Sequence, residues 1–141
     1  MEKINFVNNQ APAISASSLN QLQTNVESAI NGVVESGSND NGYWVKYSDG
    51  TMECYGTKSY ESTAFAATGN VYYRDLSGVT FPVPFKENEI IVPTCSMAMG
   101  NVGAITPISV SNTGISGFSV LSASSSARGI TVYWRAIGKW K

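Results

Sequence analysis

Residues 43–55 have the sequence Tyr43-Trp44-Val45-Lys46-Tyr47-Ser48-Asp49-Gly50-Thr51-Met52-Glu53-Cys54-Tyr55. Two stretches rich in aromatic and β-branched residues, which favour strands, flank an Asp-Gly pair, and this arrangement is a strong signal for a β-hairpin. In the second stretch Met52 and Cys54 alternate with Glu53, as expected of a strand with one face in a core. The segment therefore predicts an antiparallel β domain.

Further strands are expected along the rest of the chain, because runs of strand-forming residues alternate with Gly, Pro, Asn and Ser clusters about every ten residues. The expected strands cover residues 71–73, 79–81, 90–97, 105–111, 117–123 and 129–139. Many short strands at this spacing are typical of a sandwich or a small barrel. The predicted fold class is therefore mainly β, an antiparallel β-sandwich or small barrel preceded by one N-terminal helix.

The last expected strand has the alternation of a strand with one buried face. One set is Ile130, Val132, Trp134 and Ala136, and the other is Thr131, Tyr133, Arg135 and Ile137. One of the two sets must face the core. We therefore expect Trp134 to be a core residue rather than an exposed platform for a sugar.

The N-terminal part predicts an extended arm followed by a helix. Residues 1–14 are polar and contain a proline, and Ser15, Ser17 or Ser18 can each cap a helix that follows. The apolar residues of that helix recur at steps of three and four, which is the spacing of a coiled-coil seam. They are Leu19, Leu22, Val26, Ala29 and Val33, with Ile30 widening the stripe. Glycine and serine end the helix between residues 32 and 37.

The apolar stripe of this helix has two interpretations. A helix of roughly five turns with one narrow stripe is not stable alone in water, so it must pack on the chain's own β domain or on copies of itself. The arm before the helix and the polar linker expected at residues 36–42 favour self-association. The expected organisation is an arm and coiled-coil-type helix for attachment and oligomerisation, residues 1–37, and a β head, residues 38–141.

Composition and charge exclude several classes of protein. The chain has 141 residues, of which 43% are hydrophobic and only 13% are charged. Nine basic residues against ten acidic ones leave a formal charge of −1, which gives no electrostatic reason to bind nucleic acid or an anionic membrane. No apolar run approaches the roughly 20 residues of a membrane helix. The first residues lack the charged-then-apolar pattern of a signal peptide, so no export is expected.

The available side chains argue against catalysis. The chain has no histidine, which excludes imidazole-based zinc sites and Ser-His or Cys-His catalytic pairs. A carboxylate pair for glycoside hydrolysis remains open, although the acidic residues are scattered. We therefore expect no enzyme activity, no cofactor and no metal. Cys54 and Cys95 are expected to be free, buried thiols, with a disulfide between them as the alternative.

One long stretch of the chain carries no charge. No Asp, Glu, Lys or Arg occurs in the 38 residues from Ile90 to Ala127, although a solvated surface normally carries charges on the outer face of each strand. Small neutral side chains let a second protein surface approach without desolvating an ion. Burial between subunits is the favoured interpretation, and a Ser/Thr-rich exterior of an extracellular β protein is the alternative.

Three segments of the chain, the expected hairpin at residues 43–57, the proline-containing residues 81–85 and the C-terminal residues 133–141, together resemble the C-terminal head of bacteriophage tail-fibre and receptor-binding proteins. Residues 43–57, Tyr-Trp-Val-Lys-Tyr-Ser-Asp-Gly-Thr-Met-Glu-Cys-Tyr-Gly-Thr, are similar to the opening hairpin of that family. Residues 81–85, Phe-Pro-Val-Pro-Phe, are similar to its FPVxF segment, and residues 133–141 are similar to its terminal W-x-A-I-G-x-W strand. The resemblance covers about residues 42–141.

The resemblance implies a homotrimeric fibre or spike protein of the virion, made in the host cytoplasm, whose head binds a bacterial surface glycan or cell-wall polymer for host attachment. Aromatic rings stack on sugars while short polar groups satisfy hydroxyls. The candidate ligand-binding residues are Tyr60, Tyr72, Tyr73, Arg74 and Asp75.

Other functions stay open at this point. The alternative is a non-catalytic head-fibre or decoration protein that docks to other virion proteins through residues 1–14. A polysaccharide-degrading enzyme is a third possibility, and it would need a convergent carboxylate pair. A secreted bacterial lectin is the fourth, and the absence of a signal peptide argues against it.

Overall fold

The structure is a computed structural model that describes residues 15–29 and 32–141. The chain divides into two compact units, Met1–Val33 and Val34–Lys141. The first unit contains the helix, and the second is the β head. The head begins at Val34, a few residues before the boundary expected from the sequence.

Most of the described part of the first unit is the helix α1 (Ala16–Ala29). Ser15 caps it, because its Oγ accepts the N–H of Ser18 at 3.1 Å. The predicted seam is wrong at its C-terminal end, since Val33 lies in a strand and not in the helix. Gly32 has a φ of 65°, which favours glycine and separates helix from strand. Ile30, the widening residue of the predicted stripe, lies outside the described residues.

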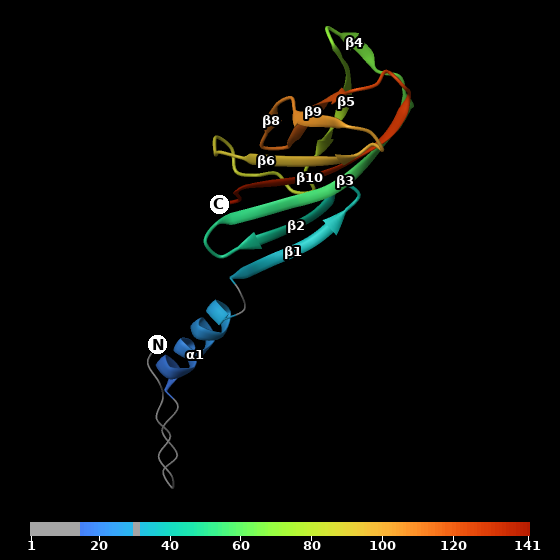
Figure 1. The fold of residues 1–141 in the computed structure, drawn as a ribbon. Coiled ribbons are helices and arrows are strands. Elements are labelled where there is room, and N and C mark those ends of the chain that lie inside the picture. The colour runs from blue at the N-terminus through green and yellow to red at the C-terminus, as the bar shows by residue number, and fades with distance from the viewer. Residues whose placement is uncertain (1–14, 30–31) are drawn as a thin grey trace. The chain divides into compact units, whose positions relative to one another are not determined.

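The head contains two β-sheets, which Figure 1 shows as two layers. Sheet A has the order β1 (Val33–Asn39), β2 (Gly42–Tyr47), β3 (Thr51–Thr63), β10 (Arg128–Lys139) and β6 (Val92–Ala98). Sheet B has the order β4 (Ala66–Thr68), β5 (Val71–Thr80), β9 (Gly114–Ser122) and β7 (Gly103–Pro107), and β8 (Val110–Ser111) also pairs with β9. The pairs β2–β3, β3–β10, β10–β6, β4–β5, β5–β9 and β9–β7 are antiparallel.

The core lies between the two sheets and takes alternate residues from each. Sheet A contributes Met52, Cys54, Ile130, Val132, Trp134 and Ala136, and sheet B contributes Leu76, Ile115, Phe118 and Val120. The predicted alternation of the last strand is therefore confirmed, and Trp134 is a core residue with 3% of its surface exposed. Of the two architectures expected, the described residues form the antiparallel β-sandwich, as predicted.

The opening hairpin forms as predicted. Tyr43 pairs with Tyr55, and Lys46 pairs with Met52 across the turn. Asp49 stabilises that turn by accepting the N–H of Thr51 at 2.8 Å, which is the usual role of Asp in a tight turn.

The predicted linker at residues 36–42 is wrong, because its first part belongs to β1. Glu35 ties this strand to β2: its carboxylate accepts Trp44 Nε1 at 3.1 Å and pairs with Lys46 Nζ at 2.9 Å. The Lys46 bond and then the Trp44 bond lower the pKa of Glu35. Gly37 lies against the same indole, since a Cβ there would come within 2.5 Å of the Trp44 ring. The glycine that suggested a linker is therefore needed for packing.

Three strand boundaries also differ from the prediction. Residues 71–73 and 79–81 were expected as separate strands, but residues 71–80 form the single strand β5. The expected strand at 105–111 is divided into β7 and β8. Strand β6 begins at Val92 and contains Pro93. A proline is compatible with this position because β6 is an edge strand of sheet A.

Candidate functional site

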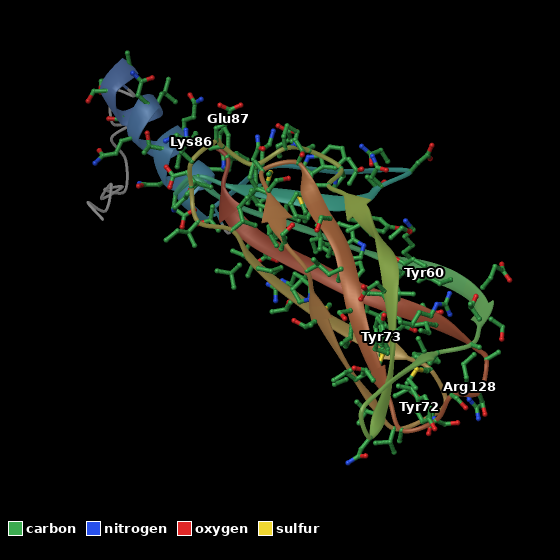
Figure 2. All side chains as sticks on the ribbon, turned by 90° about the horizontal axis from the view of Figure 1, so that it is seen from above. Tyr60, Tyr72, Tyr73, Lys86, Glu87 and Arg128 are labelled. Carbon is green, nitrogen blue, oxygen red and sulfur yellow. The ribbon has the colours of Figure 1, made fainter. Side chains whose placement is uncertain are left out.

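The five residues proposed from the sequence as ligand contacts do not form one surface. Tyr60 lies on β3, and Tyr72 to Asp75 lie on β5. Successive residues of a strand point to opposite faces, and Tyr60 and Tyr72 pack against the core. Tyr73 is 39% exposed on the other face. Figure 2 shows the three tyrosines toward the end of the head where Arg128 lies, away from Lys86 and Glu87.

Tyr60 and Arg74 form contacts that join the two sheets. The hydroxyl of Tyr60, on sheet A, donates to the carbonyl of Ser77 on sheet B. Arg74, on sheet B, donates to the carbonyls of Glu61 at 3.0 Å and Arg128 at 3.2 Å, both on sheet A. Burial raises the pKa of Tyr60, which keeps its hydroxyl a donor. These contacts give both side chains a structural role that requires no ligand.

The most exposed tyrosines lie on the outer face of sheet A. Tyr43 on β2, Tyr55 on β3 and Tyr133 on β10 are 53%, 41% and 48% exposed. The rings of Tyr43 and Tyr55 stack with centroids 5.4 Å apart and planes 14° apart. Stacking of this kind fixes both rings and adds to the stability of the strand pair.

A charged pair lies beside these rings. Arg135 is opposite Tyr55 in the β3–β10 register, and its guanidinium is 2.7 Å from the carboxylate of Glu53. Thr94 lies opposite Arg135, and Ser96 lies opposite Tyr133, both on the edge strand β6. A shallow depression is lined by these two residues together with Tyr133 and Arg135. We call Tyr43, Tyr55, Tyr133, Glu53 and Arg135 the aromatic platform.

The platform was not predicted, although its signal is present in the sequence. The alternation that places Met52, Cys54 and Trp134 in the core also places Tyr55 and Tyr133 on the opposite face. The order of the strands in the sheet cannot be read from the sequence pattern. The pairing of β3 with β10 connects positions about eighty residues apart and brings Arg135 beside Tyr55.

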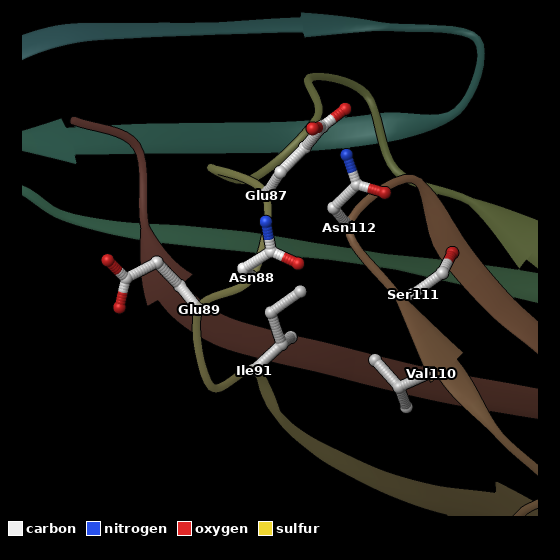
Figure 3. Close-up of a pocket in the computed structure, with 7 residues that line it drawn as sticks. All are labelled: Glu87, Asn88, Glu89, Ile91, Val110, Ser111 and Asn112. Carbon is white, nitrogen blue, oxygen red and sulfur yellow. The ribbon is translucent and has the colours of Figure 1, made fainter.

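Another pocket lies at the loop that precedes β6. It is lined by Glu87, Asn88, Glu89, Ile91, Val110, Ser111 and Asn112. Figure 3 shows the carboxylates of Glu87 and Glu89 pointing in different directions, and Glu89 pairs with Lys86 at 3.1 Å. These two carboxylates do not form the convergent pair that glycoside hydrolysis uses. In residues 15–29 and 32–141, no three Asp, Glu, Cys or His side chains are placed to hold a metal ion.

The two cysteines are free thiols, as expected, and the alternative of a disulfide is wrong. Cys54 is buried, and Cys95 is only partly buried. Burial raises the pKa of the Cys54 thiol to about 11, and burial also raises the pKa of Cys95. Both thiols are therefore protonated near neutral pH, which makes them poor nucleophiles.

Within the part of the chain that the structure describes, no helix is both long and apolar enough to cross a membrane.

The comparisons with known proteins identify solved structures that share this fold. No family model matches the chain, and no curated protein matches it. Among solved structures, the chain is similar to an N-truncated R1-type pyocin tail fibre, with a TM-score of 0.51 and 21% identity over 91% of this chain and 99% of that one.

A second similar structure is an R1 pyocin fibre of P. aeruginosa comprising C-terminal residues 323–701. Its TM-score is again 0.51 and its identity 21%, over 88% of this chain and 31% of that one. The chain thus spans about a third of the length of that longer fibre fragment. The resemblance to tail-fibre heads seen in residues 43–57, 81–85 and 133–141 is confirmed at the level of the fold: this chain has the fold of a pyocin tail fibre over 91% of its length.

Proposed function

We propose that the chain is a trimeric fibre or spike protein of a bacteriophage virion, and that its β head binds a glycan or cell-wall polymer on the bacterial surface. The observation that carries the proposal is the fold shared with a pyocin tail fibre over 91% of the chain. A fold alone does not determine a function. Two further features of the described residues support self-association, and the exposed aromatic residues support binding.

The helix supports self-association. Leu19, Leu22 and Val26 of α1 are each about half exposed, at 54%, 53% and 49%. A helix of 14 residues is marginal by itself in water and needs tertiary or quaternary packing. Copies of the same helix provide that packing, because the spacing of these residues is that of a coiled-coil seam.

The outer face of sheet B is the second feature. Its central part consists of two rows of residues that lie opposite one another across β5, β9 and β7. One row is Tyr73, Leu121 and Ala104, and the next is Asp75, Ser119 and Thr106. Asp75 is the one charged residue in these two rows. A face so poor in charge can contact another head with little loss of ion hydration. This face consists largely of the uncharged segment between Ile90 and Ala127.

The proposed function assigns no catalysis to the chain. The alternative is a head-fibre or decoration protein that attaches to other virion proteins through residues 1–14, which lie outside the described residues. A labelled full-length chain, incubated with a panel of bacterial strains, separates the two functions. The proposal predicts that at least one strain is labelled, whereas a decoration protein leaves every strain unlabelled. Release of reducing sugar from the labelled cells would contradict the non-catalytic assignment.

A further inference from the structure

We propose that the aromatic platform on the outer face of sheet A is the carbohydrate-binding site of the head, and that its ligand is a neutral, hydroxyl-rich surface polysaccharide. This inference rests on the proposed function. It places the site on Tyr43, Tyr55 and Tyr133 with the Glu53–Arg135 pair, and not on the segment from Tyr60 to Asp75.

The exposure of the rings is the first argument. Tyr43, Tyr55 and Tyr133 expose between 41% and 53% of their surfaces, so they offer apolar area that the fold does not use. Aromatic side chains bring large contact area at little cost in side-chain entropy, since they have only two side-chain torsions. The C–H faces of a pyranose ring are flat and apolar, and they pack on such rings.

The rings are also held in place before any ligand binds. Tyr43 and Tyr55 stack on each other, and they sit on adjacent strands of a continuous antiparallel ladder. Cys54 and Trp134, the chain neighbours of Tyr55 and Tyr133, are packed in the core beneath the sheet. A site on paired strands with a packed underside loses little freedom on binding.

The charged pair provides the polar part of the site. A guanidinium nitrogen of Arg135 is 2.7 Å from a carboxylate oxygen of Glu53, and the Glu53 and Arg135 side chains are 22% and 51% exposed. The ion pair does not use every N–H donor of the guanidinium or every lone pair of the carboxylate, so both groups can form further hydrogen bonds. Sugar hydroxyls both donate and accept, so they fit such a pair. Because the two charges cancel, the platform has no electrostatic preference for an ionic polymer.

A second copy of the chain is a poorer occupant of this face. A protein–protein contact over the platform would have to bury the Glu53–Arg135 pair, and desolvation of an ion pair commonly offsets its attraction. A polysaccharide is hydrated and leaves the pair partly in water. Sheet B offers a face with only Asp75 in its two central rows, which is more suitable for contact between copies.

The test uses the labelled full-length chain on the strain panel, with five variants, one of which, Tyr73→Ala, probes the segment from Tyr60 to Asp75. Tyr43→Ala and Tyr133→Ala each remove one platform ring, and Tyr133→Phe keeps the ring. Val102→Ala is the matched control, because Val102 is an apolar side chain that is 78% exposed outside the platform. Stacking on one ring is worth about 0.5–1.5 kcal/mol, or roughly a twofold to twelvefold change in affinity per site.

We expect Tyr43→Ala and Tyr133→Ala each to weaken cell binding by roughly twofold to twelvefold per site, and by more if several sites act together. Val102→Ala should bind as the unaltered chain does, Tyr133→Phe should bind more strongly than Tyr133→Ala because it keeps the ring, and all variants should keep the solution mass of the unaltered chain. Oxidation of the cells with periodate, which cleaves the vicinal diols of sugars, should abolish labelling, and treatment with protease should not.

Three results overturn the inference. If both alanine variants bind normally, or if Tyr73→Ala loses binding in their place, the platform is not the site, although the proposed function stands. Labelling that survives periodate but is lost with protease rejects a carbohydrate ligand and leaves receptor binding in place. If no strain is labelled by the unaltered chain, the site and the proposed function are both wrong.

Discussion

Two arginines of the head should respond oppositely to the same substitution, Arg→Met. Arg74 donates two hydrogen bonds that join sheet B to the carbonyls of Glu61 and Arg128 on sheet A. Arg135 lies on the outer face of sheet A and pairs with Glu53 while half exposed. Methionine keeps much of the apolar length of the side chain and removes the charge and every donor. The comparison therefore separates a structural arginine from one proposed to contact a ligand.

The magnitudes follow from these contacts. A hydrogen bond from a charged donor contributes about 1.5–3 kcal/mol, and the lower figure applies to Arg74 because its side chain is only partly buried. Two such bonds give about 3 kcal/mol. For a domain of this size about 4 °C in Tm corresponds to 1 kcal/mol, so Arg74→Met should lower Tm by about 12 °C. An exposed ion pair contributes about 0–1 kcal/mol, so Arg135→Met should lower Tm by less than about 4 °C.

Thermal unfolding followed by circular dichroism measures the stability of the two variants. Labelling of a receptive strain, at a temperature well below the Tm of both variants, measures their binding to cells. We expect Arg74→Met to be destabilised but to bind cells, and Arg135→Met to be stable but to bind weakly. The reasoning is refuted if Arg74→Met has the Tm of the unaltered chain, since the bonds between the sheets would then contribute nothing. It is equally refuted if Arg74→Met is the variant that loses binding while it stays folded.

Three further predictions concern the core, the helix and the head. Burial raises the pKa of Cys54 from 9.0 to about 11, so the contribution of the protonated thiol to stability is present below pH 9 and is lost as pH rises through 11. The free energy of unfolding should therefore fall by about 2 kcal/mol between pH 9 and pH 11, and Cys54→Ala should show a correspondingly smaller fall in denaturant titrations. Leu22→Asp or Val26→Asp places a charge in the helical seam of every chain and should weaken assembly by several kcal/mol; an unchanged solution mass in both variants rejects the seam. A truncated chain that begins at Val34 retains the complete head unit and should still associate, and Ser119→Lys, on the neutral face of sheet B, should abolish that association. A well-folded monomer at micromolar concentration, without the added lysine, contradicts the role of that face.

The sequence predicts the fold class well because the signals are local. The turn at Asp49 and the alternation from Ile130 to Ala136 each lie within one or two strands, and the structure confirms both. The prediction of a linker at residues 36–42 was wrong because two different physical causes can require a glycine at position 37. Chain flexibility is a local reason, whereas close approach of the Trp44 ring depends on the pairing of β1 with β2.

The proposed binding surface could be predicted only in part, for the same physical reason. Aromatic residues clustered in sequence, such as Tyr72 and Tyr73, point to opposite faces of one strand. Residues that share a face come from distant strands, as Tyr55 and Arg135 do. Local composition identifies which residue types are present, but strand order determines which of them meet. The exposure of Tyr43, Tyr55 and Tyr133 therefore becomes meaningful only when the sheet is known.

The measurement that tests the central claim most directly is the solution mass of the full chain by sedimentation equilibrium, taken at several concentrations. A trimeric fibre protein predicts three chains of 15.0 kDa, about 45 kDa, that persist on dilution to low micromolar concentration. A mass of 15.0 kDa at every concentration, in a sample that is folded by circular dichroism, would contradict the account, because the stripe of α1 and the neutral face of sheet B would then have no partner in other copies of the chain.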